Sequence, residues 1–92
     1  MQHDREFFAG LNCPNRVTWS NDIKQMFTAL DIDHMKKKGI DLSDYQDVKV
    51  NAAQIYTRVA NGSMPPPGSG EPRWPQPKVD TFGCWIQQGC PQ

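Results

Sequence analysis

The sequence predicts a small all-α domain of three to four helices with one long proline-rich loop. Apolar residues recur at intervals of three and four in several stretches, the spacing that places them on one face of a helix. No stretch shows the alternation of apolar and polar residues that is typical of a half-buried strand. Six of the eight prolines fall between Ser63 and Pro77, where neither a helix interior nor a central strand is expected.

The 92 residues suffice for one domain, which we divide into an N-terminal arm at residues 1–16 and a helical domain at residues 17–92. The arm shows no sustained periodicity and contains Pro14. We expect it to drape over the helical domain, with Phe7 and Phe8 fixing it there.

The first helix is expected to begin at Ser20, a residue type that accepts a hydrogen bond from the first turn. One apolar face follows, formed by Ile23, Met26, Phe27 and Leu30. The next stretch, "DIDHMKKKG", predicts a short helical turn with Asp31 as its cap and Gly39 as its stop.

Two further helices flank the proline-rich loop. The helix before the loop is capped either by Ser43, paired with Gln46 in a capping box, or by Asp47, and it ends at Gly62. The helix after the loop begins near Pro77, because proline suits a first helical turn. Its apolar residues are Val79, Phe82, Trp85 and Ile86.

Charge and hydropathy exclude several classes of partner. Ten Lys and Arg balance ten Asp and Glu, so no net field draws the chain to nucleic acid or to an anionic membrane. No apolar run approaches the roughly 20 residues of a membrane-spanning helix, and the N-terminal residues do not resemble a signal peptide. We therefore expect a cytoplasmic protein with no nucleic-acid and no membrane partner.

Three cysteines, Cys13, Cys84 and Cys90, are an odd number and lack CxxC spacing. Neither a disulfide framework nor a zinc site is therefore expected from them. A cytoplasmic compartment also keeps thiols reduced, which disfavours a single bridge. A bridge between Cys84 and Cys90 is the one pairing left open, if the chain folds back after the last helix.

Four segments resemble, in order and spacing, parts of a class I cytochrome c domain over residues 17–91. They are "TWSNDIKQMF", "GIDLSDYQDV", "IYTRVANGSMPPPG" and "VDTFGCWIQQGCP". The third is similar to the helix that runs into a Met-Pro dipeptide, whose methionine is the axial haem ligand in that family. The resemblance implies a cytochrome c-like fold with Met64 at the position of that ligand.

The chain departs from this family at the haem-attachment motif. The family attaches haem through Cys-x-x-Cys-His, whereas this chain has "TALDIDHM", without cysteine and with His34 about where the motif's histidine stands. The resemblance therefore carries over only His34 and Met64, as the two cofactor-binding positions. Either no cofactor is bound, or haem is bound without thioether links, in which case methionine ligation raises its reduction potential. In a haem-free domain the space is filled by aromatic side chains such as Trp19, Tyr45, Trp74 and Phe82.

His34 has two further interpretations besides haem ligation. Asp31 lies three residues earlier on the same face of a helical turn, so His34 is a candidate catalytic base oriented by that carboxylate. With Met64, and with Cys84 as a third ligand, His34 instead offers donors that suit Cu(I). A histidine beside acidic residues is also an ordinary surface feature.

Trp74 is the candidate partner-binding residue. Prolines interleaved with this tryptophan form a stiff surface that can dock onto a protein. The alternative is that Trp74 closes the core, because a small domain needs every large apolar side chain that it can bury.

The sequence thus predicts a binding or accessory module without covalent haem, whose partner is a protein or a small-molecule ligand held between His34 and Met64. Two alternatives stay open. One is a small enzyme that uses the vacated haem cleft, with His34 as acid and base. The other is an electron carrier that binds haem non-covalently through His34 and Met64.

Overall fold

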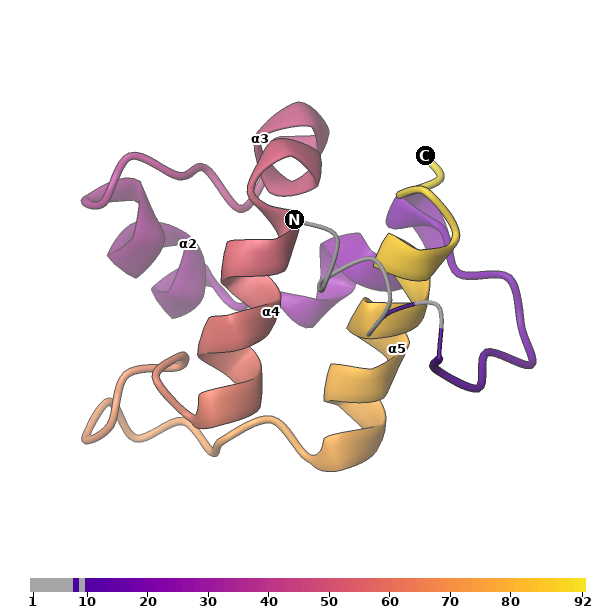
Figure 1. The fold of residues 1–92 in the computed structure, drawn as a ribbon. Coiled ribbons are helices and arrows are strands. Elements are labelled where there is room, and N and C mark those ends of the chain that lie inside the picture. The colour runs from indigo at the N-terminus through magenta and orange to yellow at the C-terminus, as the bar shows by residue number, and fades with distance from the viewer. Residues whose placement is uncertain (1–7, 9) are drawn as a thin grey trace.

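Helices form all the regular structure in the part of the chain that the computed structural model describes, Phe8 and residues 10–92 (Figure 1). The elements are the π-helical turn η1 (Trp19–Ile23), the 3-10 turn η2 (Lys24–Met26), α2 (Ala29–Lys36), α3 (Tyr45–Val50), α4 (Ala52–Asn61) and α5 (Gln76–Gln87). The prediction of a small all-α domain is confirmed. Among these described helices, none has the length and apolar character needed to cross a membrane.

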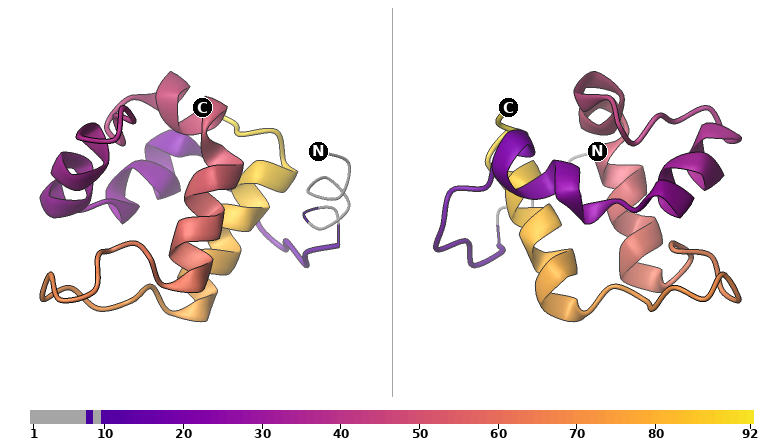
Figure 2. Two further views of the ribbon diagram at one scale, coloured as in Figure 1. Left: turned by 60° about the vertical axis from the view of Figure 1, so that its left-hand side comes forward. Right: turned by 180° about the vertical axis from the view of Figure 1, so that it is seen from behind.

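α4 and α5 form the centre of the fold. They lie side by side and run in opposite directions, joined at one end by the proline-rich loop of residues 62–75 (Figures 1 and 2). The η1–η2 segment crosses this pair, and α2 lies on the α4 side, away from α5 (Figure 2). The loop therefore passes on the same side of the molecule as α2.

The first helical stretch differs from its prediction at both ends. Thr18, not Ser20, is the N-cap, because its hydroxyl accepts a hydrogen bond from the first turn and its own N–H donates to Asp22. The stretch ends at Phe27, whose backbone is extended, with φ −95° and ψ 130°. Leu30 consequently belongs to α2 and is 40% exposed instead of lying on the predicted apolar face.

The caps of α2 and α3 also fall on residues that the sequence did not single out. Thr28 is the N-cap of α2, and Asp31 is the third helical residue, which completes a capping box. Asp44 caps α3 by accepting the N–H of Asp47 at 3.0 Å. Ser43 does not take that role, because its hydroxyl donates to a carboxylate two residues earlier.

The ends of the helices next to the proline-rich loop agree with the sequence prediction. Gly62 adopts a left-handed conformation with φ 84° and ends α4, as expected of a glycine C-cap. The Arg58 carbonyl accepts the N–H groups of Ser63 at 2.9 Å and Met64 at 3.1 Å. Pro77 lies in the first turn of α5. Met64 is thus positioned directly by the end of α4.

An aromatic cluster forms the middle of the core. The rings of Phe27, Trp74 and Phe82 contact one another, with centroids 5.8, 6.1 and 6.2 Å apart. Trp85, fully buried, continues the cluster 5.5 Å from Phe82, and its indole N–H donates to the Pro91 carbonyl at 2.8 Å. Aromatic side chains supply the large buried apolar area that a domain of this size requires.

The last residues of the chain pair with the beginning of η1. The N–H of Trp19 donates to the carbonyl of Pro91 at 2.9 Å, and that of Ser20 donates to the carbonyl of Gln92 at 3.1 Å. The Ser20 hydroxyl donates to the same Gln92 oxygen at 2.9 Å. The two ends of the helical domain therefore lie against each other.

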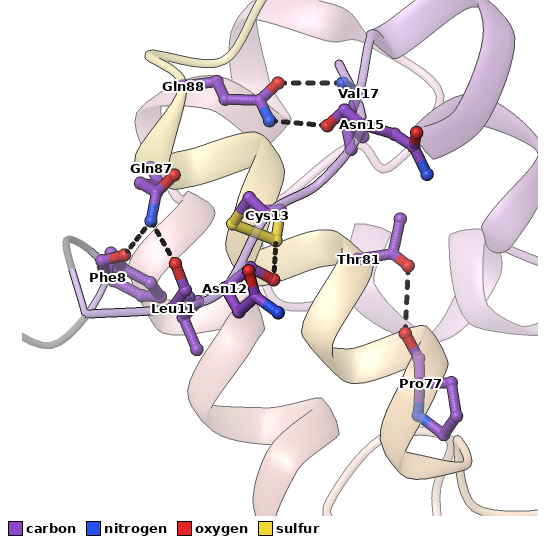
Figure 3. Close-up of a disulfide and its surroundings, with 11 residues drawn as sticks. Phe8, Leu11, Asn12, Cys13, Asn15, Val17, Pro77, Thr81, Gln87 and Gln88 are labelled. Carbon is purple, nitrogen blue, oxygen red and sulfur yellow. Dashed lines mark hydrogen bonds between the residues drawn. A yellow bond between two sulfur atoms is a disulfide. The ribbon is translucent and has the colours of Figure 1, made fainter.

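One disulfide forms, and it is not the pairing that the sequence left open. Cys13 and Cys84 are bonded, with their Cα atoms 5.5 Å apart across 71 residues of sequence (Figure 3). Cys90 is free and buried, so the bridge left open between Cys84 and Cys90 does not form. An odd count leaves one cysteine over but does not prevent a pair, and so long a separation has no local signature.

The described part of the arm does lie on the helical domain, as expected. Phe8 is buried and packs edge-to-face against Tyr56 of α4, with ring centroids 5.0 Å apart. Leu11 reaches α5 at Gly83, where an added Cβ would lie 2.6 Å from the leucine Cδ1. Phe7, the other residue expected to fix the arm, lies outside the described residues.

Candidate functional site

The predicted catalytic residues Asp31 and His34 both lie on α2, and Asp31 is engaged in starting that helix. Its carboxylate accepts the N–H of Thr28 at 3.1 Å, and its own N–H donates to the Thr28 hydroxyl at 3.1 Å. The side chain is 1% exposed. A carboxylate in the first turn is favoured by the helix dipole, so the capping box explains one of the two carboxylate oxygens of Asp31.

His34 is half-buried one turn further along α2. Among the described residues, no hydrogen bond or ion pair joins it to Asp31, although the two are three residues apart on the helix. The nearby Asp33 instead forms an exposed ion pair with Lys37 at 3.7 Å. The structure thus does not show the oriented carboxylate that a histidine general base uses, and the acid–base role of His34 stays a prediction.

Charged groups from three segments meet at the start of α2. The Thr28 hydroxyl donates to Glu71 of the proline-rich loop at 2.9 Å, which ties that loop to the helix. The Lys78 ammonium lies 4.2 Å from the centre of the Trp74 ring. Burial lowers the pKa of Lys78, against the attraction of Asp31 and Glu71, which favours the charged amine. The second carboxylate oxygen of Asp31 is buried without a hydrogen-bond partner.

Met64 is enclosed in the core and is 1% exposed. It belongs to the same buried cluster as Phe27, Trp74 and Phe82. A haem iron could reach the Met64 sulfur only if these side chains moved apart, which would expose a large apolar area. As packed, the residues do not fit a haem held between His34 and Met64, and we derive no chemistry through one.

The alternative copper site loses one of its three donors. Cys84 is bonded to Cys13 and has no thiolate to offer a soft ion. Within Phe8 and residues 10–92, no group of three or more His, Cys, Asp and Glu side chains is arranged to hold a metal ion.

Trp74 lies inside the domain. Its ring is 5% exposed, contacts Phe27 and Phe82, and is covered by Lys78. This burial supports the interpretation that Trp74 closes the core. Docking of a partner onto Trp74 stays a prediction, and it would have to involve the covering Lys78 as well.

A groove of about 410 Å³ opens on the other side of the molecule, between the arm and α5. Neither His34 nor Met64 lines it. Its charged residues are Arg16, Asp22 and Asp80, of which Asp80 accepts a hydrogen bond from the Gln76 amide at 2.8 Å. The remaining lining residues are Asn12, Pro14, Asn15, Val17, Pro77, Thr81 and Cys84.

The sequence reasoning missed the second covered face of α5. Gly83 and Gln87 are four residues apart, as are Cys84 and Gln88, so each pair lies on one side of the helix. A glycine and a cysteine inside an otherwise apolar helix were the available signal that another segment approaches there. No sequence pattern indicated the charged cluster at Glu71 and Lys78, because its members come from different segments.

Comparison with known proteins finds a partial relative. No family model matches the chain, and no solved structure matches it. Among curated proteins, the chain is similar to Cyclopenase penL of Penicillium thymicola, with 32% identity over 89 residues and 86% of this chain covered. The chain spans 12% of the length of that relative. The similarity therefore concerns one segment of a much larger protein.

Proposed function

We propose that this chain is a cytochrome c-like module without covalent haem that serves as a binding or accessory unit for an enzyme of the cyclopenase kind. The proposal depends on the lengths of the two proteins: 86% of this chain matches a segment that makes up only 12% of Cyclopenase penL. A unit of this size is expected to contribute binding or positioning to a large enzyme, with the reacting groups supplied by the rest.

The interior of the domain supports an accessory role over an independent catalytic one. Met64 and Trp74 are buried at 1% and 5% exposure, in the region where the resemblance to cytochromes c places the haem. Asp31 completes the capping box of α2, and among the described residues no hydrogen bond or ion pair joins it to His34. The described interior is closed and apolar around Met64 and Trp74, which is what a module retained for its shape and surface requires.

A replacement experiment tests the proposal directly. The matching segment of Cyclopenase penL is exchanged for this chain, and turnover of that enzyme is compared with the parent and with a variant lacking the segment. We expect the exchange to retain activity and the deletion to lose it. If the deletion variant is folded, as judged by circular dichroism, and fully active, the segment has no accessory role and the proposal fails.

Absorption spectroscopy separates the module from the haem-carrier alternative. The purified chain is titrated with haem up to one equivalent, and we expect the Soret band to remain that of free haem, because Met64 is enclosed in the core. A shifted and sharpened band that is lost in both His34→Ala and Met64→Ala would establish a non-covalent haem carrier instead. Turnover by the isolated chain that His34→Ala abolishes, without a change in unfolding temperature, would establish the enzyme alternative.

A further inference from the structure

The described arm crosses a face of α5 that differs from the face in the aromatic cluster. One disulfide joins the two segments, between Cys13 of the arm and Cys84 of α5 (Figure 3). Three residues along the helix, the Gln87 amide donates to the carbonyls of Phe8 at 2.7 Å and Leu11 at 2.8 Å. The helix thus holds the arm by its backbone at the turn that joins Phe8 to Leu11.

The arm is held a second time where it joins the helical domain. The Gln88 side chain accepts the N–H of Val17 and donates to the carbonyl of Asn15, both at 2.8 Å (Figure 3). Between these points the Leu11 side chain occupies the space above Gly83, which has no side chain to obstruct it. Arg16, between Asn15 and Val17, is exposed.

These contacts differ in how much they resist release of the arm. The hydrogen bonds join neutral amides to backbone groups, and water offers equivalent bonds to a released arm, so their net contribution is small. Within the described residues no ion pair joins the arm to the helical domain. Apolar contacts of Phe8 with Tyr56 and of Leu11 with Gly83 also favour the docked arm. Among the described contacts of the arm, the bond between Cys13 and Cys84 is the covalent one, and its loss on reduction is what can shift the arm toward release.

Solvent reaches the neighbourhood of this bond. The groove of about 410 Å³ is lined by Cys84 together with Asn12 and Pro14, which flank Cys13 in sequence. Cys13 itself is half-buried. Cys84 is buried, so a small thiol reagent would approach the disulfide from the half-buried Cys13.

We propose that the Cys13–Cys84 disulfide is a redox-controlled lock on the arm: the intact bond keeps residues 10–16 on α5, and its reduction releases them while the helical domain stays folded. The reductant is a dithiol. One of its thiolates attacks a disulfide sulfur and the S–S bond breaks, so the other cysteine leaves as a thiolate. The second thiol of the reductant then attacks the mixed disulfide, and the remaining cysteine leaves as a thiolate. In total the dithiol supplies two electrons and two protons and becomes a cyclic disulfide, and the protein gains two thiols.

The helical domain is expected to survive reduction because the aromatic centre of its core does not involve the arm. Leu11 and Cys13 of the arm pack against the core but are not part of its buried centre. The ring contacts among Phe27, Trp74, Phe82 and Trp85 involve no residue before Val17. The third cysteine, Cys90, is buried and its carbonyl accepts the Tyr45 hydroxyl at 2.6 Å. The lock is independent of the proposed function, because it depends only on the arm and α5.

Cleavage by trypsin after Arg16 tests the lock. The peptide bond between Arg16 and Val17 is pinned on both sides by Gln88, so it resists a protease that needs an extended, free segment. We expect reduction with dithiothreitol to speed this cleavage by about tenfold or more, as measured by mass spectrometry. The near-ultraviolet circular dichroism of the tryptophans, which all lie in the helical domain, should persist.

Matched variants separate the lock from a general effect of reductant. The double variant Cys13→Ser, Cys84→Ser should be cleaved rapidly with or without dithiothreitol. Cys90→Ser should behave as the unmodified protein does. Equal cleavage rates in the oxidised and reduced protein would overturn the proposal. Loss of the near-ultraviolet signal on reduction would also overturn it, since the bond would then hold the whole domain together.

Discussion

α5 presents two faces that are covered by different means. On one face, Phe82 and Trp85 are fully buried among other aromatic rings. On the other, Gly83, Cys84 and Gln87 hold the arm through a close approach, a disulfide and hydrogen bonds. The first face gains stability in proportion to buried area, whereas the second depends on exact placement of a few atoms. One helix thus combines a permanent packing surface with a releasable one.

Removal of a ring from the aromatic face should have the largest effect. Phe82→Ala leaves a cavity among Phe27, Trp74 and Trp85, so we expect the free energy of unfolding to fall by about 3–5 kcal/mol. Urea denaturation of the oxidised protein measures this change. Phe82→Leu fills most of the space and should cost less. A loss below about 1 kcal/mol for Phe82→Ala would show that the cluster is loosely packed.

Substitution of Met64 tests whether the buried core on the aromatic face of α5 includes the proline-rich loop. Because Met64 is 1% exposed, Met64→Ala should lower the free energy of unfolding by about 2–5 kcal/mol. Met64→Leu keeps the volume and should cost less than about 1.5 kcal/mol. Similar stability of the alanine variant and the unmodified protein would contradict the enclosed position of this side chain.

Changes on the arm face should be smaller. Gln88→Ala removes the hydrogen bonds to Asn15 and Val17, and we expect a loss of about 1–2 kcal/mol while the disulfide is intact. Equilibrium unfolding in urea measures the change. Gln46→Ala, at an exposed position on α3, is the matched control and should be neutral. A loss for Gln88→Ala as large as that for Phe82→Ala would contradict the contrast between the two faces.

Of these tests, a rise to alkaline pH should produce the smallest change in the stability of the domain. Burial raises the pKa of the Cys90 thiol above its ordinary value of 9.0, against the attraction of Lys49, which favours the thiolate. The native state therefore holds this proton more tightly than the unfolded state. Its contribution to stability is complete below pH 9.0 and is lost as the pH rises through the raised native pKa.

Unfolding temperatures at pH 8 and pH 10 provide the measurement for Cys90. The Cys90→Ala variant should lose less stability over this interval than the unmodified protein, because it has no thiol to ionise. Tyr56, whose pKa burial also raises, is present in both proteins and cancels in the comparison. Parallel declines of the two proteins would mean that Cys90 ionises equally in both states.

The sequence predicted the helix ends that depend on the backbone preferences of glycine and proline. Gly62 and Pro77 mark the end of α4 and the start of α5, because their backbone preferences leave little choice. The caps Thr18 and Asp44 were missed, because several side chains within three residues can accept the same hydrogen bonds. Leu30 fits a helical period, but the chain becomes extended at Phe27 and the period is interrupted.

Contacts between distant segments could not be predicted in the same way. The pairing of Cys13 with Cys84 requires the path of the arm, which no local pattern encodes. Asp31 was expected to cap α2, but Thr28 takes that position and Asp31 is the third helical residue. Its predicted orientation of His34 stays a prediction. Met64 was predicted at a ligand position by resemblance, and its burial depends on how Trp74 folds back from the loop.

The first turn of η1 is hydrogen-bonded to the last residues of the chain. This closeness of the two ends affects how the helical domain can be inserted into a larger protein. Trp19 and Ser20 are bonded to Pro91 and Gln92, so the helical domain spans almost no distance between its entry and exit points. A domain with adjacent ends can be inserted into a surface loop without stretching the host on either side. For the same reason, a short linker across these ends should permit circular permutation, with new termini in the exposed part of the proline-rich loop.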